Sequence, residues 1–232
     1  MLVPYIFPFS SLALISGRAT INSLDVLTIL MATYLYILCQ ALDIRALQAE
    51  FYEELDTIIT KELLTAFGTF LDEATFRTIS SEVKKIMRET FDTTSTMDAV
   101  DRMNKVAASS TNCIMDFFTR PDFAEAASMG PALSFIPAFR AQVASKAHTL
   151  LLQLRADYLS GAKGAAPASI YLNKTRPIYE YVRVNLGIRM HGSENNAMFA
   201  NGLGVDDVTI GQNISLIQEV RVFVWFTSFL LS

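Results

Sequence analysis

The stretch 20–51 constrains this chain more than any other part of its sequence, because it contains neither proline nor glycine. From Leu24 to Leu42 apolar residues fall on every side of a helix with 3.6 residues per turn. A helix that is apolar all round must be buried on all sides. After Leu42 polar residues separate Ile44, Leu47 and Phe51 at helical spacing. This pattern predicts that the C-terminal end of the helix emerges towards a more solvent-exposed surface. The rest of the chain, another subunit or a bilayer must therefore cover the apolar part.

Composition favours a soluble protein with a large apolar core. Hydrophobic residues make up 51% of the 232 residues, and they include 16 Phe and 9 Met. A net charge of -4 and a pI near 5.2 argue against a nucleic-acid partner. Two cysteines, Cys39 and Cys113, are too few for a disulfide framework, and both read as small buried hydrophobes. This cysteine usage is typical of a reducing compartment.

A membrane-spanning helix is the main alternative for the stretch from Leu24 to Leu42, since about 20 apolar residues cross a bilayer. Asp25 and Gln40 interrupt the stretch, and no cluster of Lys or Arg flanks it. We therefore expect a soluble protein without membrane contact, and keep a small membrane protein as an alternative. Pro4 and Pro8 interrupt the apolar N-terminus, no basic region precedes it, and no signal peptide is predicted.

Helical periodicity recurs along the chain, and no segment shows sustained strand alternation between hairpin turns. The sequence therefore predicts an all-α fold. A helical turn or loop ending at Gly17 is expected before the long helix, with Asn22 or Ser23 as its N-cap. Further helical patterns cover 51–71, 73–91, 96–121, 138–159 and 175–186, and a last one begins near 207. Pro131 and Pro137 frame a broken region, 160–169 has the composition of a linker, and 189–207 reads as a mobile loop.

Residues that could carry chemistry form no catalytic or metal-binding pattern. The two histidines stand without a second ligand at metal-binding spacing, and no nucleophile motif or phosphate-binding glycine motif is complete. A structural role is preferred for each residue considered as a metal ligand, nucleophile, phosphate-binding glycine or catalytic carboxylate: His148, His191, Cys39, Gly202, Gly204, Asp206, Asp207 and Asp43. Asp206 and Asp207 are interpreted as a helix cap and its neighbour, and Asp43 with Arg45 as a local ion pair or a subunit contact. Spacing therefore predicts no catalytic, cofactor-binding or metal-binding residue.

Four tracts resemble one family. Residues 39–45, CQALDIR, resemble the C-Q-A-(I/L)-D-(L/I)-R signature of the aromatic amino acid ammonia-lyases, in particular those of fungal phenylalanine ammonia-lyase type, and 11–18, SLALISGR, are similar to their S-L-(A/G)-L-I-S-x-R. Downstream, 175–187 resemble T-R-x-x-Y-x-x-V-R-x-x-L-G and 209–217 resemble T-I-G-x-N-x-S-x-I. Ordered and well-separated matches argue against chance.

The resemblance implies a bundle of long helices in a homotetramer whose core combines several subunits. It also implies non-oxidative removal of ammonia from L-phenylalanine or L-tyrosine, giving trans-cinnamate or coumarate, in the cytoplasmic catabolism of L-phenylalanine or in phenylpropanoid metabolism. The family's electrophile is a methylidene-imidazolone made from Ala-Ser-Gly. The implied division is a divergent N-terminus over 1–10, the end of the lyase core over 11–50, an inserted helical (shielding-type) domain over 51–166, a return to the core over 167–219 and a divergent tail over 220–232.

The residues needed for the reaction do not occur in this sequence. No Ala-Ser-Gly is present, since Ser16-Gly17 follows Ile15 and Ser160-Gly161 follows Leu159, and MLVPYIFPFS stands where the family has E-x-x-N-Q. We therefore carry over no catalytic residue, and expect a C-terminal fragment that is inactive alone. Both ends are interpreted as non-coding sequence translated by a truncated gene model. A non-catalytic helical protein that docks onto lyase subunits is the other alternative, and the sequence does not choose between phenylalanine and tyrosine.

Overall fold

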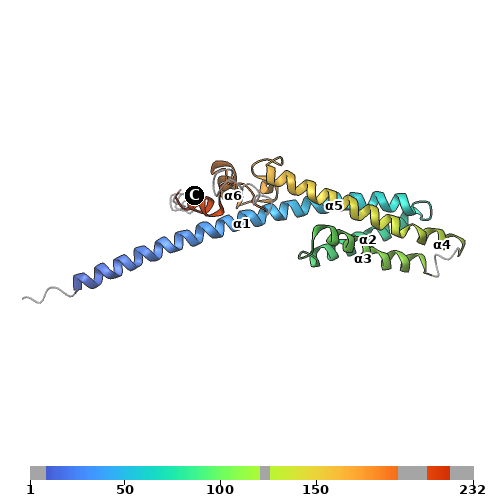
Figure 1. Cartoon of the computed structure of the whole chain (residues 1–232), viewed down its shortest axis with the longest axis horizontal. Helices are drawn as coiled ribbons and strands as arrows, with labels where there is room; N and C mark the ends of the chain where they lie inside the picture. The colour runs from blue at the N-terminus through green and yellow to red at the C-terminus, as the bar shows by residue number, and fades with distance from the viewer. Residues whose placement is uncertain (1–8, 121–125, 193–207, 220–232) are drawn as a thin grey trace, which may run out of the picture. The chain divides into compact units, whose positions relative to one another are not determined.

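The structure is a computed structural model that describes residues 9–120, 126–192 and 208–219, and every regular element in these ranges is helical (Figure 1). The predicted all-α fold is confirmed. The chain divides into two compact units: unit 1 comprises Met1–Ala46 with Tyr158–Ser232, and unit 2 comprises Leu47–Asp157. The implied division into core segment, inserted domain and return stays a prediction.

The first helix, α1 (Phe9–Phe67), is continuous through both units. The predicted loop ending at Gly17 and the predicted N-cap at Asn22 or Ser23 are therefore wrong, and the separate helix expected from Phe51 is the same helix. Hydroxyl side chains explain part of this continuity, because the Ser23 hydroxyl donates to the Ala19 carbonyl inside the helix at 2.8 Å instead of capping a new one.

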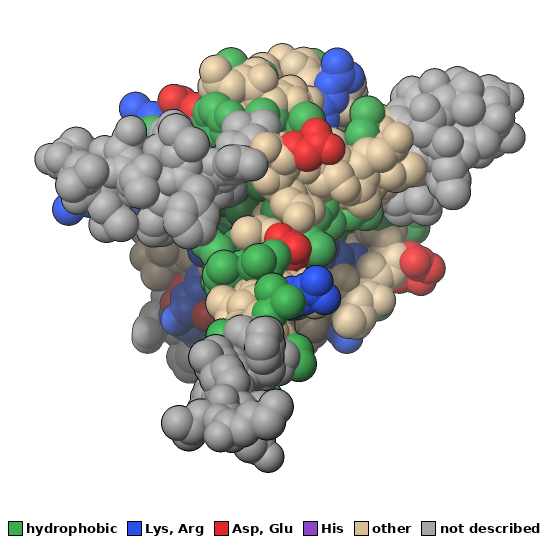
Figure 2. Space-filling model, turned by 90° about the vertical axis from the view of Figure 1, so that its left-hand side faces the viewer, with side chains coloured by type: hydrophobic (Ala, Val, Ile, Leu, Met, Phe, Trp, Pro, Cys, Tyr) green, Lys and Arg blue, Asp and Glu red, His purple; other side chains and the backbone are tan. Residues whose placement is uncertain are grey.

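Only one side of α1 is covered within unit 1. Its buried residues there are Ala32, Tyr36, Cys39, Asp43 and Ala46. Large apolar side chains elsewhere are exposed, and they include Leu12, Leu14, Ile15, Ile21, Leu24, Val26, Leu27, Ile29, Leu30, Met31, Tyr34, Ile37 and Leu38. Apolar side chains lie uncovered on the face drawn in Figure 2. The described residues of this chain therefore cover only one stripe of the helix, and covering of the rest by another subunit or a bilayer stays a prediction.

Unit 2 contains the end of α1 with α2 (Glu73–Thr93), α3 (Ala99–Phe118), α4 (Ala126–Ser134) and most of α5 (Ile136–Ser160). Residues of α1 at a spacing of four form one fully buried stripe, Phe51, Leu55, Ile59, Leu63 and Phe67. The ring of Phe67 lies 5.5 Å from that of Phe118 and 5.8 Å from that of Phe139. Aromatic packing therefore joins α1, α3 and α5 in the core of this unit.

The turn after α1 depends on a glycine and an N-cap. A Cβ added at Gly68 would lie 2.5 Å from the Leu64 carbonyl oxygen, so only glycine fits directly after the end of the helix. The Asp72 carboxylate then accepts hydrogen bonds from the backbone N–H groups of Ala74 and Thr75. This is the N-cap arrangement that begins α2.

The helix bounds of unit 2 lie within three residues of the predicted ones for α2, α3 and α5. The predicted break between Pro131 and Pro137 is confined to Phe135, which separates the end of α4 at Ser134 from the start of α5 at Ile136. Pro131 lies inside α4, and Pro137 stands in the first turn of α5, where a missing backbone N–H costs no helical hydrogen bond.

Unit 1 continues after α5 with turns and short helices. A 3₁₀ turn over Pro167–Tyr171 precedes α6 (Arg176–Glu180), which runs into a π-helical turn over Tyr181–Asn185. The predicted helix over 175–186 is confirmed as helical, with this change of pitch. We call residues 158–192 the C-terminal return. The last described helix is α7 (Ile210–Glu219), where the Gln218 side chain donates to the Thr28 hydroxyl of α1 at 3.4 Å. Most of the predicted loop 189–207 and the tail 220–232 lie outside the described residues.

Candidate functional site

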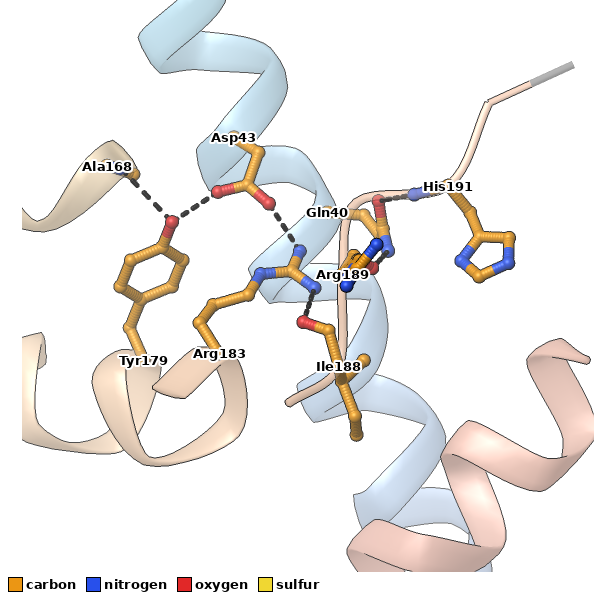
Figure 3. Close-up of polar contacts among 8 residues, drawn as sticks. All are labelled: Gln40, Asp43, Ala168, Tyr179, Arg183, Ile188, Arg189 and His191. Atoms are coloured by element: carbon orange, nitrogen blue, oxygen red, sulfur yellow. Dashed lines mark hydrogen bonds and ion pairs between the residues drawn. The ribbon is translucent and has the colours of Figure 1, made fainter. Parts of the chain in front are cut away.

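The polar centre of unit 1 is a buried carboxylate on α1, Asp43 (Figure 3). The Arg183 and Asp43 side chains are each 1% exposed, and Arg183 Nη2 lies 2.5 Å from Asp43 Oδ2. The Tyr179 hydroxyl donates to Asp43 Oδ1 and accepts a hydrogen bond from the Ala168 backbone N–H at 3.1 Å. We call these four residues the Asp43 cluster. It joins α1 to the C-terminal return, across 136 positions of sequence.

Local helix geometry brings the tyrosine and the arginine to one carboxylate. Tyr179 and Arg183 are four residues apart, so they lie on one side of a helix. The π-helical turn widens the backbone here, with the Leu186 N–H donating to the Tyr181 carbonyl at 3.0 Å. Arg183 lies within this turn and is buried, and its Nη1 also donates to the Ile188 carbonyl at 2.8 Å.

A glycine permits this last contact. Gly187 has φ of +68°, a conformation that other residues rarely adopt. It turns the chain directly before Ile188, whose carbonyl accepts from Arg183. The family-like tract R-x-x-L-G thus corresponds to a guanidinium and the turn that supplies its second acceptor.

Burial decides the electrostatics of the Asp43 cluster. It raises the pKa of the Asp43 carboxyl above its usual range, and the Arg183 guanidinium and the Tyr179 hydroxyl oppose this shift. Burial, followed by the bond to the carboxylate, also raises the pKa of the Tyr179 hydroxyl. One turn away, burial raises the pKa of the Cys39 thiol to about 11. Neither Tyr179 nor Cys39 therefore ionises near neutral pH, which argues against a nucleophile or general base here.

Gln40 makes a second connection between α1 and the C-terminal return. Its Nε2 donates to the Arg189 carbonyl at 3.2 Å, and its Oε1 accepts from the His191 backbone N–H at 3.1 Å (Figure 3). One amide side chain therefore satisfies two backbone groups of a segment without regular secondary structure.

A cavity of about 310 Å³ borders the Asp43 cluster. Its lining consists of Asp43, Tyr158, Ser160, Gly161, Gly164, Ala165, Pro167, Arg183, Val184, Gly187, Arg189 and Met190. The two buried charges in this wall, Asp43 and Arg183, are paired with each other, and Arg189 stands exposed. Besides this ion pair and Arg189, the lining contains two hydroxyl side chains, Tyr158 and Ser160, and no histidine or cysteine.

Metal binding gains no support from the part of the chain that the structure describes. There, no group of three or more His, Cys, Asp or Glu side chains is placed to hold a metal ion. His148 lies half-buried on α5, apart in sequence from the half-buried His191. Gly202, Gly204, Asp206 and Asp207 fall outside the described residues, and their structural readings stay predictions.

The local ion pair predicted between Asp43 and Arg45 is wrong, because Asp43 pairs with Arg183. Arg45, expected as a local ion-pair partner, is exposed, and residues two apart on a helix point in different directions. Arg183 takes its place. A signal was present in the sequence, because Asp43 continues the 4-3-4-3 spacing of Ala32, Tyr36 and Cys39, and a charge in such a stripe needs a distant partner.

The described residues do not fit the imidazolone electrophile that the resemblance implies. Such a ring forms from three consecutive residues, Ala-Ser-Gly, and neither Ser-Gly pair of this sequence follows an alanine. Ser16-Gly17 moreover lies within the regular backbone of α1, and Ser160-Gly161 ends α5. No reaction step is therefore assigned to these residues.

Comparison with known proteins identifies the fold. The chain superimposes on the crystal structure of phenylalanine ammonia-lyase from Rhodosporidium toruloides with a TM-score of 0.73 and 28% sequence identity, over 92% of this chain and 32% of the other. No family model matches the sequence. Unit 1 and unit 2 together thus define a helical part of an ammonia-lyase.

Sequence relatives give the family. The chain is 56% identical over 210 residues to phenylalanine ammonia-lyase 1 of Pleurotus ostreatus and 52% identical over 210 residues to phenylalanine ammonia-lyase str11 of Strobilurus tenacellus. Phenylalanine/tyrosine ammonia-lyase of Rhodotorula toruloides is 31% identical over 212 residues. This chain belongs to the phenylalanine ammonia-lyase family. The match to the Pleurotus protein covers 90% of this chain but only 28% of that protein's length.

Proposed function

We propose that this chain is a C-terminal part of an aromatic amino acid ammonia-lyase, an enzyme that removes ammonia from L-phenylalanine without oxidation and releases trans-cinnamate. The observation that carries the proposal is the 56% identity over 210 residues to a protein named phenylalanine ammonia-lyase 1. The activity belongs to the whole enzyme, of which this sequence corresponds to 28% by length in that relative.

The contribution of this chain is structural. Its sequence has no Ala-Ser-Gly from which the family's electrophile could form, and the Asp43 cluster holds its charged and phenolic groups in buried contacts with one another. Without an electrophile no group polarises the amine of the substrate as a leaving group. The isolated chain is therefore inactive towards L-phenylalanine.

A chimeric enzyme tests this proposal. Residues 11–219 replace the matching segment of the Pleurotus enzyme, and cinnamate formation from L-phenylalanine is followed by its ultraviolet absorbance. A soluble chimera that releases cinnamate, beside an inactive isolated chain, is the expected result. A chimera that is folded and soluble but makes no cinnamate would contradict the proposal.

Assembly with further copies explains the exposed side of α1. The apolar side chains from Leu12 to Leu38 are uncovered in the described chain, with exposed fractions that reach 66% at Val26. Exposed apolar surface of this extent is typical of an interface. The assembly is a homotetramer with an aromatic amino acid as substrate. Sedimentation of the chimera is expected to give one tetrameric species, and a stable monomer would exclude this assembly.

The same surface supports the two alternatives. Among the described residues, one helix, within Leu12–Phe67, is long and apolar enough to cross a membrane, and core helices of soluble proteins meet the same criteria. A cytoplasmic location is proposed because the relatives are ammonia-lyases. Alkaline carbonate washing of membranes distinguishes the cases, since a peripheral or soluble protein is released and a spanning one is retained. Co-purification of the isolated chain with full-length lyase subunits would instead favour a non-catalytic docking protein.

A further inference from the structure

The buried stripe of α1 in unit 1 nearly repeats after seven residues. It consists of Ala32, Tyr36, Cys39, Asp43 and Ala46, at alternating spacings of four and three. A shift of seven places Ala32 on Cys39 and Cys39 on Ala46, which are exchanges among small side chains of similar shape. In that shift Tyr36 takes the place of Asp43. Apolar packing alone therefore discriminates weakly between the native register and one displaced by seven residues.

We infer that Asp43 and Gln40 fix the register of the C-terminal return along α1. A displacement of seven residues towards the N-terminus would place Tyr36 against Arg183, whose guanidinium would then be buried without a counter-charge. Burying an unpaired charge is strongly unfavourable, and a single polar residue in an apolar helical seam is known to select one register. The Asp43 cluster thus selects the native register mainly by raising the free energy of the register displaced by seven residues.

Gln40 adds a second criterion that acts in both directions. Its amide bonds the Arg189 carbonyl at 3.2 Å and the His191 N–H at 3.1 Å. Seven residues earlier the helix carries Thr33, and seven residues later it carries Leu47. A leucine offers no hydrogen bond, and a threonine hydroxyl is too short to replace the amide at both backbone groups. A shift towards the C-terminus, which would bring Glu50 opposite Arg183, is therefore penalised at Leu47.

The register is measured as a distance between two spin labels on exposed residues of unit 1. Ile37 is 55% exposed and Ile170 is 76% exposed, so Ile37→Cys and Ile170→Cys carry the labels. Cys39→Ala and Cys113→Ala remove the native thiols from every variant. The labelled full chain is diluted into unlabelled chain so that double electron–electron resonance reports the distance within one chain. A displacement of seven residues moves the labels by about 10 Å along α1.

The first variant removes the register contacts with Gln40→Leu, Asp43→Leu and Arg183→Met. A second distance, or a distribution several times broader than that of the unsubstituted background, is expected. The matched control is Glu62→Leu with Lys146→Met, which removes an ion pair of 2.6 Å in unit 2 whose Glu62 side chain is 9% exposed. The control keeps the original narrow distance, because its ion pair lies outside the seam between α1 and the return.

The second variant moves the contacts by seven residues with Thr33→Gln, Tyr36→Asp, Gln40→Thr and Asp43→Tyr, leaving the composition unchanged. One narrow distance that differs from the original is expected, because the labels move by about 10 Å along α1 relative to each other. The inference is overturned when both variants keep the original single distance. It is also overturned when circular dichroism shows neither variant folded, since the cluster would then be required for folding and not for choosing a register.

Discussion

Replacing Arg183 by methionine is expected to destabilise unit 1 far more than the loss of an ordinary ion pair. The Asp43 and Arg183 side chains are each 1% exposed, with their charged atoms 2.5 Å apart. After Arg183→Met the carboxylate stays buried with one remaining donor, the Tyr179 hydroxyl. Breaking a buried pair from one side costs about 3–5 kcal/mol. Arg77→Met, in an exposed pair with Glu73, is the control and is expected to cost less than about 1 kcal/mol.

The double variant Asp43→Leu with Arg183→Met separates the worth of the pair from the cost of an unpaired charge. Apolar replacement of both partners of a buried pair is often close to neutral. We therefore expect the double variant to be more stable than Arg183→Met alone. Urea denaturation followed by circular dichroism gives the free energies of unfolding, and hydrogen exchange of peptides covering 176–188 assigns the loss to unit 1.

The pH dependence provides a further check on the cause. Burial raises the pKa of Asp43 in the folded state, and Arg183 opposes that shift. A raised folded-state pKa means that stability from this group is present in full below the unfolded pKa and is lost as pH rises through the folded one. Removing Arg183 raises the folded pKa further, so the destabilisation by Arg183→Met shrinks on acidification from pH 7 towards pH 4. An equal cost at both pH values, or a double variant as unstable as the single, would refute the reasoning.

Three more outcomes follow from other parts of the structure. Phe67→Ala removes a fully buried ring and is expected to lower the free energy of unfolding of unit 2 by about 3–5 kcal/mol in urea denaturation, because a cavity remains. Hydrogen bonds donated by Thr75 lower the pKa of the Asp72 carboxyl. The stability that the Asp72 carboxylate gives α2 is therefore present above the unfolded pKa and is lost as pH falls through the lowered folded pKa. In Asp72→Asn this pH-dependent loss of helix content, measured by circular dichroism between pH 6 and pH 2, should be smaller. Thiol labelling at pH 8 should modify the half-buried Cys113 before Cys39, because Cys39 is only 1% exposed. Burial raises the pKa of both thiols to about 11, so exposure and not ionisation sets the order. Labelling of both at the same rate would show that α1 opens readily.

Helical periodicity was sufficient to predict most of the fold. Regular apolar spacing placed α2, α3 and α5 within three residues of their bounds. The start of α1 was missed because local signals were read as breaks. A glycine within a helix costs only about 1 kcal/mol, and the helix runs through Gly17.

The Asp43 cluster was beyond prediction from local sequence for a different reason. The partners are 136 and 140 positions apart, and only the folded chain brings them together. Periodicity ended the apolar run at Leu42 and counted Asp43 among the polar residues of the wetter end, so neither its burial nor Arg183 was identified. The π-helical turn that contains Arg183 has no recognised sequence signature. The resemblance named the tracts CQALDIR and T-R-x-x-Y-x-x-V-R without revealing that they contact each other.

The continuity of α1 has a consequence for the cooperativity of unfolding. Its backbone hydrogen bonds, each reaching back four residues, cross the boundary between Ala46 and Leu47 without a break. Melting of one unit would leave the carbonyl or N–H groups of the last turn in the other unit without partners. Helix formation before Ala46 and after Leu47 is therefore cooperative along α1 itself, and local melting at either side of this position lowers the helical stability of the neighbouring turn.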